Sequence, residues 1–530
     1  MSILLIIASA LVTGLCFTFR FAGFIAYFSI IPLLYLMIKG ADENKNPVKM
    51  YFSGYLWGVV FYASIFYWFL YQYPLEYLGF SKAEAIGYVA LTWFGIGVLL
   101  SFVLALWQLS FAFFAKSGLY KAHKWLFIPF VPAVFIILEF LFTLGKFASP
   151  WARLAVTQQA YTVGLQTASV FGSYFLSFLI VFVNACLAYG FYVWKNTKQK
   201  KIPVIFASVA LGSVLLNYAV GTALYFADKS RTDALPKYYA SALQGNYISG
   251  RSDYADDWEI LDKFSQMALS EKEDNDVKLF VIPEGSFSLE LEDSELFKCE
   301  IVDFCKNNGV VMVIGCYQRD GDRLYNVTWC VSPDGSVTGP YRKQHPVPFG
   351  EFTPARELLL KMLPFLEDVT NVGDELSAGD KTTVFDSSLG KIGGFICFDS
   401  ASEQIGADAV RSGAVILYET SNDSWWMDSS QLYEHNGHAV LRAIETRRCI
   451  VRSTVSGYST VINSRGEVLA SVGALTEGAA TAEVYNRSVM SFYAKHPYLF
   501  LSLCLISSGV ISFAAVIYEI KSKRQNKNDT

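Results

Sequence analysis

The chain has 530 residues, of which 53% are hydrophobic and 17% are charged, and its formal net charge is -4. Typical soluble domains carry about 25% charged residues, so this composition excludes an ordinary soluble protein. The small net charge, without a basic cluster interleaved with aromatic residues, argues against a nucleic-acid partner.

Apolar stretches crowd into residues 1–227 and return once near the end of the chain. A membrane-spanning helix needs about 20 apolar residues. Because the first stretch has no basic start and no clear cleavage site, we expect it to be retained as a helix that forms a tight hairpin with the second. We predict about eight transmembrane helices, at residues 3–19, 21–38, 51–71, 86–115, 125–145, 167–194, 202–227 and 498–519.

Lysine is unevenly distributed over the loops between these helices. With the N-terminus inside, every inside segment carries three or more Lys or Arg residues, whereas the outside loops carry few. The positive-inside rule therefore predicts cytoplasmic N- and C-termini. It places residues 228–490 outside as one polar domain, and it makes residues 491–530 the final helix with a basic cytoplasmic tail.

Strand-like and helix-like segments alternate within residues 228–490, which predicts a layered α/β domain. The expected strands are 239–243, 277–282, 310–315, 325–330, 391–397, 414–419, 450–454 and 459–463. The expected helices are 256–270, 294–308, 401–412 and 430–447.

Three reactive side chains stand where strand-like runs of this domain end: Glu284, Lys343 and Cys397. A thiol, a carboxylate and an ammonium are the groups needed to attack a carbonyl. The cysteine supplies the nucleophile, the glutamate takes its proton, and the lysine stabilises the oxyanion. A lone cysteine would be interpreted as a buried structural thiol, but its two partners favour catalysis. We expect Gly393 and Gly394 to let the backbone turn sharply and expose the sulfur.

The nine cysteines include no CxxC pair, so a zinc ribbon is not expected, and their pairing is left open. His435 and His438 lack an evident third ligand, so we expect hydrogen-bonding roles and no metal site. For the pair Trp425 and Trp426, a lipid-facing lip and a core contact remain equally open.

The flanks of these residues resemble the nitrilase (carbon–nitrogen hydrolase) superfamily. The matching motifs are Pro-Glu at Glu284, Tyr-x-Lys-x-x-x-Val-Pro-Phe-Gly-Glu at 341–351, and Gly-x-x-Cys at Cys397. Membrane helices on both sides of such a domain resemble its apolipoprotein N-acyltransferase branch. The segments 149–151, 421–425, His435 and 442–448 also resemble that branch.

The resemblance implies a four-layer αββα domain and a two-step transfer without a cofactor in a bacterial inner membrane, with the domain on the periplasmic side. Cys397 would take an acyl chain from a phospholipid, and the amine of a diacylglyceryl-cysteine on an apolipoprotein would then receive it. Glu284 would be the general base and then acid, and Lys343 would line the oxyanion hole. It also implies supporting roles for Glu351, Phe398, Asp399 and Arg448.

Two departures from the family pattern bear on function: Phe398-Asp399 replaces Tyr-Glu, and Thr454-Val455 replaces Thr-Asn. Two alternatives therefore stay open. One is a membrane-tethered amidase or nitrilase-type hydrolase, in which water discharges the thioester. The other is a non-catalytic lipid- or lipoprotein-binding relative, in which Cys397 never acylates. We expect a monomer.

Overall fold

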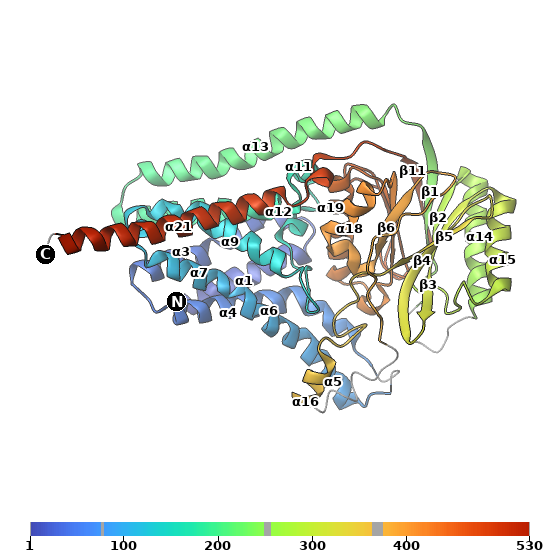
Figure 1. Ribbon diagram of the computed structural model, residues 1–530, viewed down its shortest axis with the longest axis horizontal. Helices are drawn as coiled ribbons and strands as arrows, with labels where there is room; N and C mark the ends of the chain where they lie inside the picture. The colour runs from blue at the N-terminus through green and yellow to red at the C-terminus, as the bar shows by residue number, and fades with distance from the viewer. Residues whose placement is uncertain (1, 76–78, 248–255, 363–374, 529–530) are drawn as a thin grey trace.

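A computed structural model describes residues 2–75, 79–247, 256–362 and 375–528 of the chain. A helical bundle lies at one end of the molecule and two β-sheets at the other, and both termini lie at the far end of the bundle (Figure 1). The structure confirms the predicted combination of a polytopic helical part and an α/β part.

The bundle is built from the N-terminal helices and the last one. Asn46 caps the amide of Val48 and Pro47 opens the next helix, a combination that favours helix initiation. The bundle helices are α1 (Ser2–Thr18), α2 (Ala26–Ser29), α3 (Ile31–Asp42), α4 (Pro47–Ile65), α5 (Lys82–Ala90), α6 (Ile96–Leu104), α7 (Leu106–Ala115), α8 (Gly118–Ala122), α9 (Phe127–Leu141), α10 (Thr162–Leu165), α11 (Ala168–Phe171), α12 (Ser173–Thr197), α13 (Lys201–Thr232), α20 (Phe492–Lys495) and α21 (Leu499–Asn528).

Within the described residues, seven helical stretches are long and apolar enough to cross a membrane. They are Gly23–Asp42, Pro47–Gln72, Lys82–Ala115, Lys124–Leu141, Ser173–Thr197, Lys201–Thr232 and Leu499–Gln525. The remaining apolar helix, α1, has 17 residues and packs against α3 and α4. The predicted hairpin of the first two segments is therefore present.

One predicted helix, 167–194, is interrupted in the structure. Gly172 separates α11 from α12 with a φ of +76°, in the region that favours glycine. A Cβ at this position would lie 2.5 Å from the ring of Tyr493. The break lets α11 turn towards the α/β domain while α12 continues through the bundle.

The α/β domain has two packed sheets flanked by helices, in the order helices, sheet, sheet, helices (Figure 1). The outer sheet has the order β11-β1-β2-β3-β4-β5 and is covered by α14 (Asp257–Asn275) and α15 (Glu295–Asn308). The inner sheet has the order β10-β9-β8-β7-β6 and is covered by α18 (Glu403–Arg411) and α19 (Ser430–Thr446), which face the bundle. A further short helix, α16 (Arg356–Met362), lies outside these layers.

The strands are β1 (Lys237–Gln244), β2 (Leu279–Val281), β3 (Val311–Asp320), β4 (Arg323–Val331), β5 (Val337–Arg342), β6 (Ile392–Ile396), β7 (Ile416–Ser421), β8 (Ile450–Thr454), β9 (Ser459–Ile462), β10 (Val468–Val472) and β11 (Gly478–Tyr485). Each of the eight expected strands overlaps one of these. Three strands, β5, β10 and β11, match none of the eight expected ranges, and β11 pairs antiparallel with β1 along its whole length.

A buried ionic network joins the bundle to the domain on the side of α18. Arg153 lies in the segment between α9 and α12 and pairs with Glu403 at 2.9 Å. Arg442 pairs with Glu445 at 2.8 Å and lies 3.8 Å from Glu403. Glu445 also accepts a hydrogen bond from the amide of Ser173, the first residue of α12. We call these four charged side chains the interface network.

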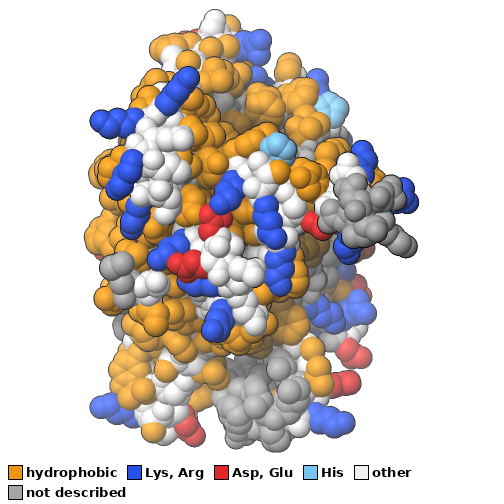
Figure 2. All heavy atoms as spheres, turned by 90° about the vertical axis from the view of Figure 1, so that its left-hand side faces the viewer, with side chains coloured by type: hydrophobic (Ala, Val, Ile, Leu, Met, Phe, Trp, Pro, Cys, Tyr) orange, Lys and Arg blue, Asp and Glu red, His pale blue; other side chains and the backbone are white. Residues whose placement is uncertain are grey.

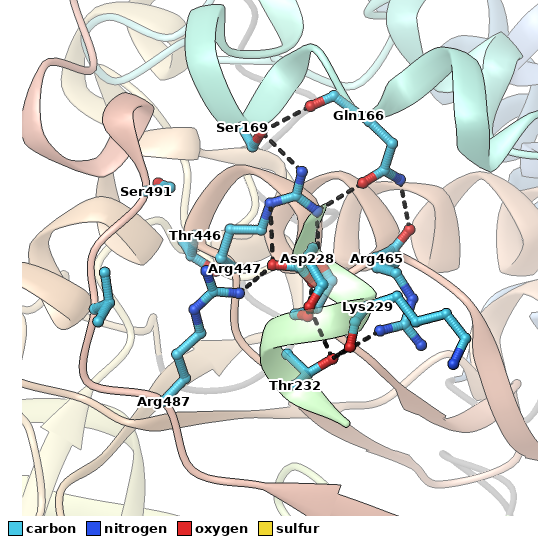
Figure 3. Close-up of polar contacts among 12 residues, drawn as sticks. Gln166, Ser169, Asp228, Lys229, Thr232, Thr446, Arg447, Arg465, Arg487 and Ser491 are labelled. Carbon is cyan, nitrogen blue, oxygen red and sulfur yellow. Dashed lines mark hydrogen bonds and ion pairs between the residues drawn. The ribbon is translucent and has the colours of Figure 1, made fainter. Parts of the chain in front are cut away.

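A second anchor lies at the domain end of α13 (Figure 3). Asp228 on α13 pairs with Arg487 and lies 3.7 Å from Arg447. Arg447 also donates to Gln166 at 2.6 Å and to Ser169 at 2.9 Å, both of which precede α12. Four separate segments of the chain are thus fixed to one another at this corner.

Candidate active site

Glu284 lies three residues past the end of β2 and is 4% exposed. Its Oε1 accepts hydrogen bonds from Asn326 at 2.6 Å and from Lys343 at 3.0 Å. Its Oε2 accepts from the backbone amide of Asn422 at 2.7 Å. These three donated hydrogen bonds fix the carboxylate in one orientation, as a positioned base requires. Asn326 and the Asn422 amide were not among the predicted site residues.

Lys343 follows β5 directly, and its backbone amide donates to the carbonyl of Asn326 at 2.9 Å. Its Nζ lies 3.0 Å from Glu284 and 2.7 Å from Glu351. Burial opposes the charge on Lys343, but the two carboxylates outweigh it and raise its pKa well above the ordinary value. The side chain is therefore an ammonium at neutral pH.

Glu351 holds the loop that follows Lys343. Its Oε1 accepts from Lys343, and its Oε2 accepts from the backbone amide of Val347 at 2.7 Å. The structure thus brings Glu284, Lys343 and Glu351 into one chain of charged contacts, as expected for three of the predicted residues.

Cys397 is the first residue after β6 and has a φ of +52°. Burial raises the pKa of its thiol well above the ordinary value; the charge of Glu284 adds to this and that of Lys343 opposes it. The resting group is a thiol, which must lose its proton to become a nucleophile. The expectation for Gly394 was wrong in its reason: a Cβ there would lie 2.2 Å from the carbonyl oxygen of Tyr418, so this glycine allows β6 to approach β7, and the turn itself falls on Cys397.

Asp399 is fully buried and joins the Cys397 turn to the Lys343 loop. Its carboxylate accepts from the Tyr341 hydroxyl at 2.7 Å and from the backbone amides of Gln344 at 3.3 Å and His345 at 2.8 Å. Through these hydrogen bonds Asp399 connects the turn at Cys397 to the loop that follows Lys343.

Phe398 points from the same turn towards the bundle. Its ring stacks on Trp151 with centroids 6.0 Å apart and planes 10° apart. Trp151 in turn lies 5.9 Å from Trp68, which meets Trp426 edge to face at 4.5 Å. Trp426 thus packs on a bundle residue, and an aromatic wall connects the bundle to the Cys397 turn.

Arg448 lies away from this group. Its guanidinium donates to backbone carbonyls, those of Ala414 at 2.9 Å and Val489 at 3.0 Å among them. Ala414 precedes β7 at the end of the parallel β6–β7 pair opposite to Cys397, roughly 20 Å away at about 3.3 Å per residue. The structure therefore places Arg448 away from Cys397, where it ties backbone carbonyl groups together, and its supporting role stays a prediction.

Cys397, Asp423 and His435 are the one set of described residues whose potential metal-donor atoms gather within 4.8 Å of one another. These atoms already serve other contacts, because Asp423 accepts from His435 at 2.8 Å and from Arg452 at 2.7 Å. A guanidinium this close opposes a divalent cation, so the set fits a hydrogen-bonded cluster better than a metal site.

Two family models match the chain. Residues 9–186 match the apolipoprotein N-acyltransferase N-terminal domain, and residues 240–492 match the carbon-nitrogen hydrolase family. Together these two segments include all of the site residues described above and most of the bundle.

Curated relatives match over nearly their whole length. The apolipoprotein N-acyltransferase of Geobacter metallireducens is 28% identical over 508 residues, which cover 94% of this chain and 92% of the relative. That of Nostoc sp. is 23% identical, with 89% of this chain and 91% of the relative covered. Among solved structures, Nit3 of Saccharomyces cerevisiae, from branch 10 of the nitrilase superfamily, matches 50% of this chain and 95% of its own at 20% identity and a TM-score of 0.37.

Proposed function

Because the chain belongs to the apolipoprotein N-acyltransferase family, in the carbon–nitrogen hydrolase superfamily, we propose that it transfers an acyl chain from a phospholipid to an apolipoprotein. The acceptor is the N-terminal amine of a diacylglyceryl-cysteine. The nucleophile is Cys397, the base is Glu284, and the oxyanion is stabilised by Lys343.

In the first half-reaction, the Sγ of Cys397 attacks the ester carbonyl of the phospholipid while its proton moves to Glu284. The negative charge that develops on the carbonyl oxygen is stabilised by the Lys343 ammonium. The intermediate then collapses, the C–O bond breaks, and Glu284 returns the proton to the leaving alcohol. The products are a thioester on Cys397 and a lysophospholipid.

In the second half-reaction, the amine of the acceptor attacks the thioester carbonyl. Glu284 takes a proton from the attacking nitrogen, the C–S bond breaks, and the proton passes to the leaving Cys397 sulfur. The amide product forms and the free thiol of Cys397 is regenerated, with no change in oxidation state. A thioester keeps its acyl-transfer potential while one lipid leaves and another arrives, which suits ping-pong kinetics.

The observation that carries this proposal is the single ammonium of Lys343 between two carboxylates, with the charge of Glu284 acting on the pKa of the Cys397 thiol. A base with excess negative charge beside it is able to accept the thiol proton. The aromatic wall from Trp68 to Phe398 supports a lipid substrate, because it leads from the bundle to the nucleophile.

We further propose that the chain lies in a bacterial inner membrane with the α/β domain on the periplasmic side. Lys and Arg side chains gather at the end of the bundle that faces the viewer in Figure 2, away from the sheets. Lys45, Lys116, Lys121 and Lys195, all at or beyond the ends of bundle helices, are exposed. A basic end of a bundle faces the cytoplasm by the positive-inside rule.

The test is intact-mass spectrometry of the purified protein incubated with a phospholipid, with Cys397→Ala as the matched control. We expect an acyl-sized mass gain on the wild type alone, which hydroxylamine removes and a diacylglyceryl-cysteine peptide discharges while gaining the chain. A gain that only water discharges would support the hydrolase alternative, which the carbon–nitrogen hydrolase match favours. No gain on folded protein would reject the acyl-enzyme.

A further inference from the structure

Four charged side chains are completely buried behind the Cys397 turn, and the proposed transfer uses none of them. They are Glu419 on β7, Asp423 just after β7, His435 on α19 and Arg452 on β8. Arg452 lies 2.7 Å from Asp423 and 3.2 Å from Glu419. We call these four residues the His435 cluster.

Both ring nitrogens of His435 face acceptors. Nδ1 lies 2.8 Å from Oδ1 of Asp423, and Nε2 lies 3.1 Å from the carbonyl oxygen of Cys397. Nε2 is also 3.2 Å from Oε1 of Glu419. A neutral imidazole has one N–H and would leave one nitrogen facing an acceptor without a hydrogen. An imidazolium, which donates from both nitrogens, satisfies this geometry.

The charge balance of the cluster leads to the same protonation state. Two carboxylates and Arg452 alone would leave one net negative charge fully buried, which is costly. A charged His435 makes the cluster neutral. Burial opposes this charge, but Asp423 outweighs it and raises the pKa of His435 to about 9.

This cluster lies against the reactive sulfur. The Sγ of Cys397, an oxygen of Asp423 and a ring nitrogen of His435 are all within 4.8 Å of one another. A net negative charge at that distance would disfavour the Cys397 thiolate, because buried like charges repel strongly. The carbonyl that His435 binds belongs to the residue with a φ of +52°.

We propose that His435 is a positioning residue for the nucleophile: its imidazolium holds the Cys397 carbonyl in the left-handed turn and cancels the negative charge beside the sulfur. The inference rests on the proposed role of Cys397. The His435 cluster would act on Cys397 in the resting protein, before any lipid binds.

The other charges that act on Cys397 come from different elements and stay constant in the test. They are Glu284, Lys343 and Glu351. On the other side of His435 lie His438 of the same helix and Trp151, and burial lowers the pKa of His438 so that it is neutral. Replacing His435 by a neutral residue therefore removes one positive charge from the cluster and leaves Arg452 in place.

The test is the pH dependence of iodoacetamide alkylation of Cys397, followed by mass spectrometry of the peptide that contains it. His435→Gln keeps a donor for the Cys397 carbonyl but removes the charge. We expect half-maximal alkylation to move up by about one pH unit, a tenfold slower reaction at fixed pH. Adding Glu419→Gln restores neutrality and should reverse the shift. His438→Gln is the matched control and should leave the profile unchanged.

An unchanged profile in folded His435→Gln would overturn the proposal, and so would a shift that Glu419→Gln does not reverse, because a packing defect is not cured by removing a charge. If His435→Gln does not fold, Glu419→Gln alone decides: it should move the profile to lower pH, and no movement counts against the proposal. Alkylation needs no lipid, so failure of the wild type to form an acyl-enzyme is a separate result.

Discussion

The reactive group, formed by Glu284, Lys343 and Glu351 beside Cys397, and the interface network around Arg153 are both buried ionic clusters. They differ in the balance of positive and negative charges. In the interface network two arginines meet two glutamates. In the reactive group one ammonium meets two carboxylates beside a thiol. The balanced network holds elements in place, whereas the unbalanced one keeps the spare negative charge that a base needs. Burial alone does not separate the two roles, since most of the charged side chains in both clusters are buried.

The largest expected effect comes from removing the spare charge. Glu284→Gln keeps an oxygen for Asn326 and Lys343 but cannot accept a proton. We expect acyl-enzyme formation to slow by about a thousandfold, within the usual range for a lost general base, with the melting temperature almost unchanged. Single-turnover mass spectrometry measures the rate. Glu483→Gln, on exposed β11, is the matched control, and a loss below tenfold would remove Glu284 from the base role.

Breaking the balanced network should affect stability more than chemistry. Arg153→Met leaves the carboxylate of Glu403 with only the more distant Arg442, and breaking a buried pair costs about 3–5 kcal/mol. We expect a clear fall in melting temperature in detergent. The double variant Arg153→Met with Glu403→Gln should recover part of the loss, because no unpaired charge remains. Equal melting of the single and double variants would show that the pair is not coupled.

The His435 cluster predicts a pH effect of smaller size. The folded pKa of about 9 lies above the ordinary value of 6.5, so the charged ring stabilises the folded state fully below pH 6.5. That contribution is lost as pH rises through about 9, at no more than about 1.4 kcal/mol per pH unit. Thermal denaturation of the wild type should show this decline between pH 6.5 and 9. A His435→Gln protein that declines equally would contradict it.

The smallest effect is expected at an exposed pair. Lys237 lies 3.4 Å from Glu483, and both side chains are more than 40% exposed. We expect Lys237→Ala to change stability by less than about 1 kcal/mol, since solvent and salt screen such pairs. Melting in low and high salt checks this. A change as large as that of Arg153→Met would remove the contrast between buried and exposed pairs.

Glu284 and Cys397 were predictable because each follows an apolar run that forms a fully buried strand, whereas Lys343 follows β5, which is only partly buried. Their supporting contacts were not, because they arise from pairing between distant strands. Asn326 reaches Glu284 across 42 residues and the Asn422 amide across 138. One signal was available: Asn326 is a polar residue inside the mostly apolar run 325–330, where a buried amide needs a partner.

The missed strand β11 has a physical explanation. Its sequence, Gly-Ala-Ala-Thr-Ala-Glu-Val-Tyr, is rich in residues that are depleted in strands. It is extended because β1 offers it eight consecutive backbone partners. The break at Gly172 was missed for a similar reason: its cause is the ring of Tyr493, more than 300 residues away. Strand and helix propensities depend on residues that are close in the sequence, whereas β11 and the break at Gly172 depend on residues that are close only in space.

The pairing of β1 with β11 also sets an order in time. Lys237 opens the domain and pairs with Tyr485, almost at its end, so the outer sheet cannot close until nearly the whole domain has been made. At about 5–20 residues per second, β1 waits on the order of tens of seconds for its partner during synthesis. We expect chains truncated before Gly478 to remain sensitive to protease, and chains ending after Tyr485 to resist it. The domain would then mature just as the last helix, α21, begins to emerge, so that the two events share one short interval of the chain's synthesis.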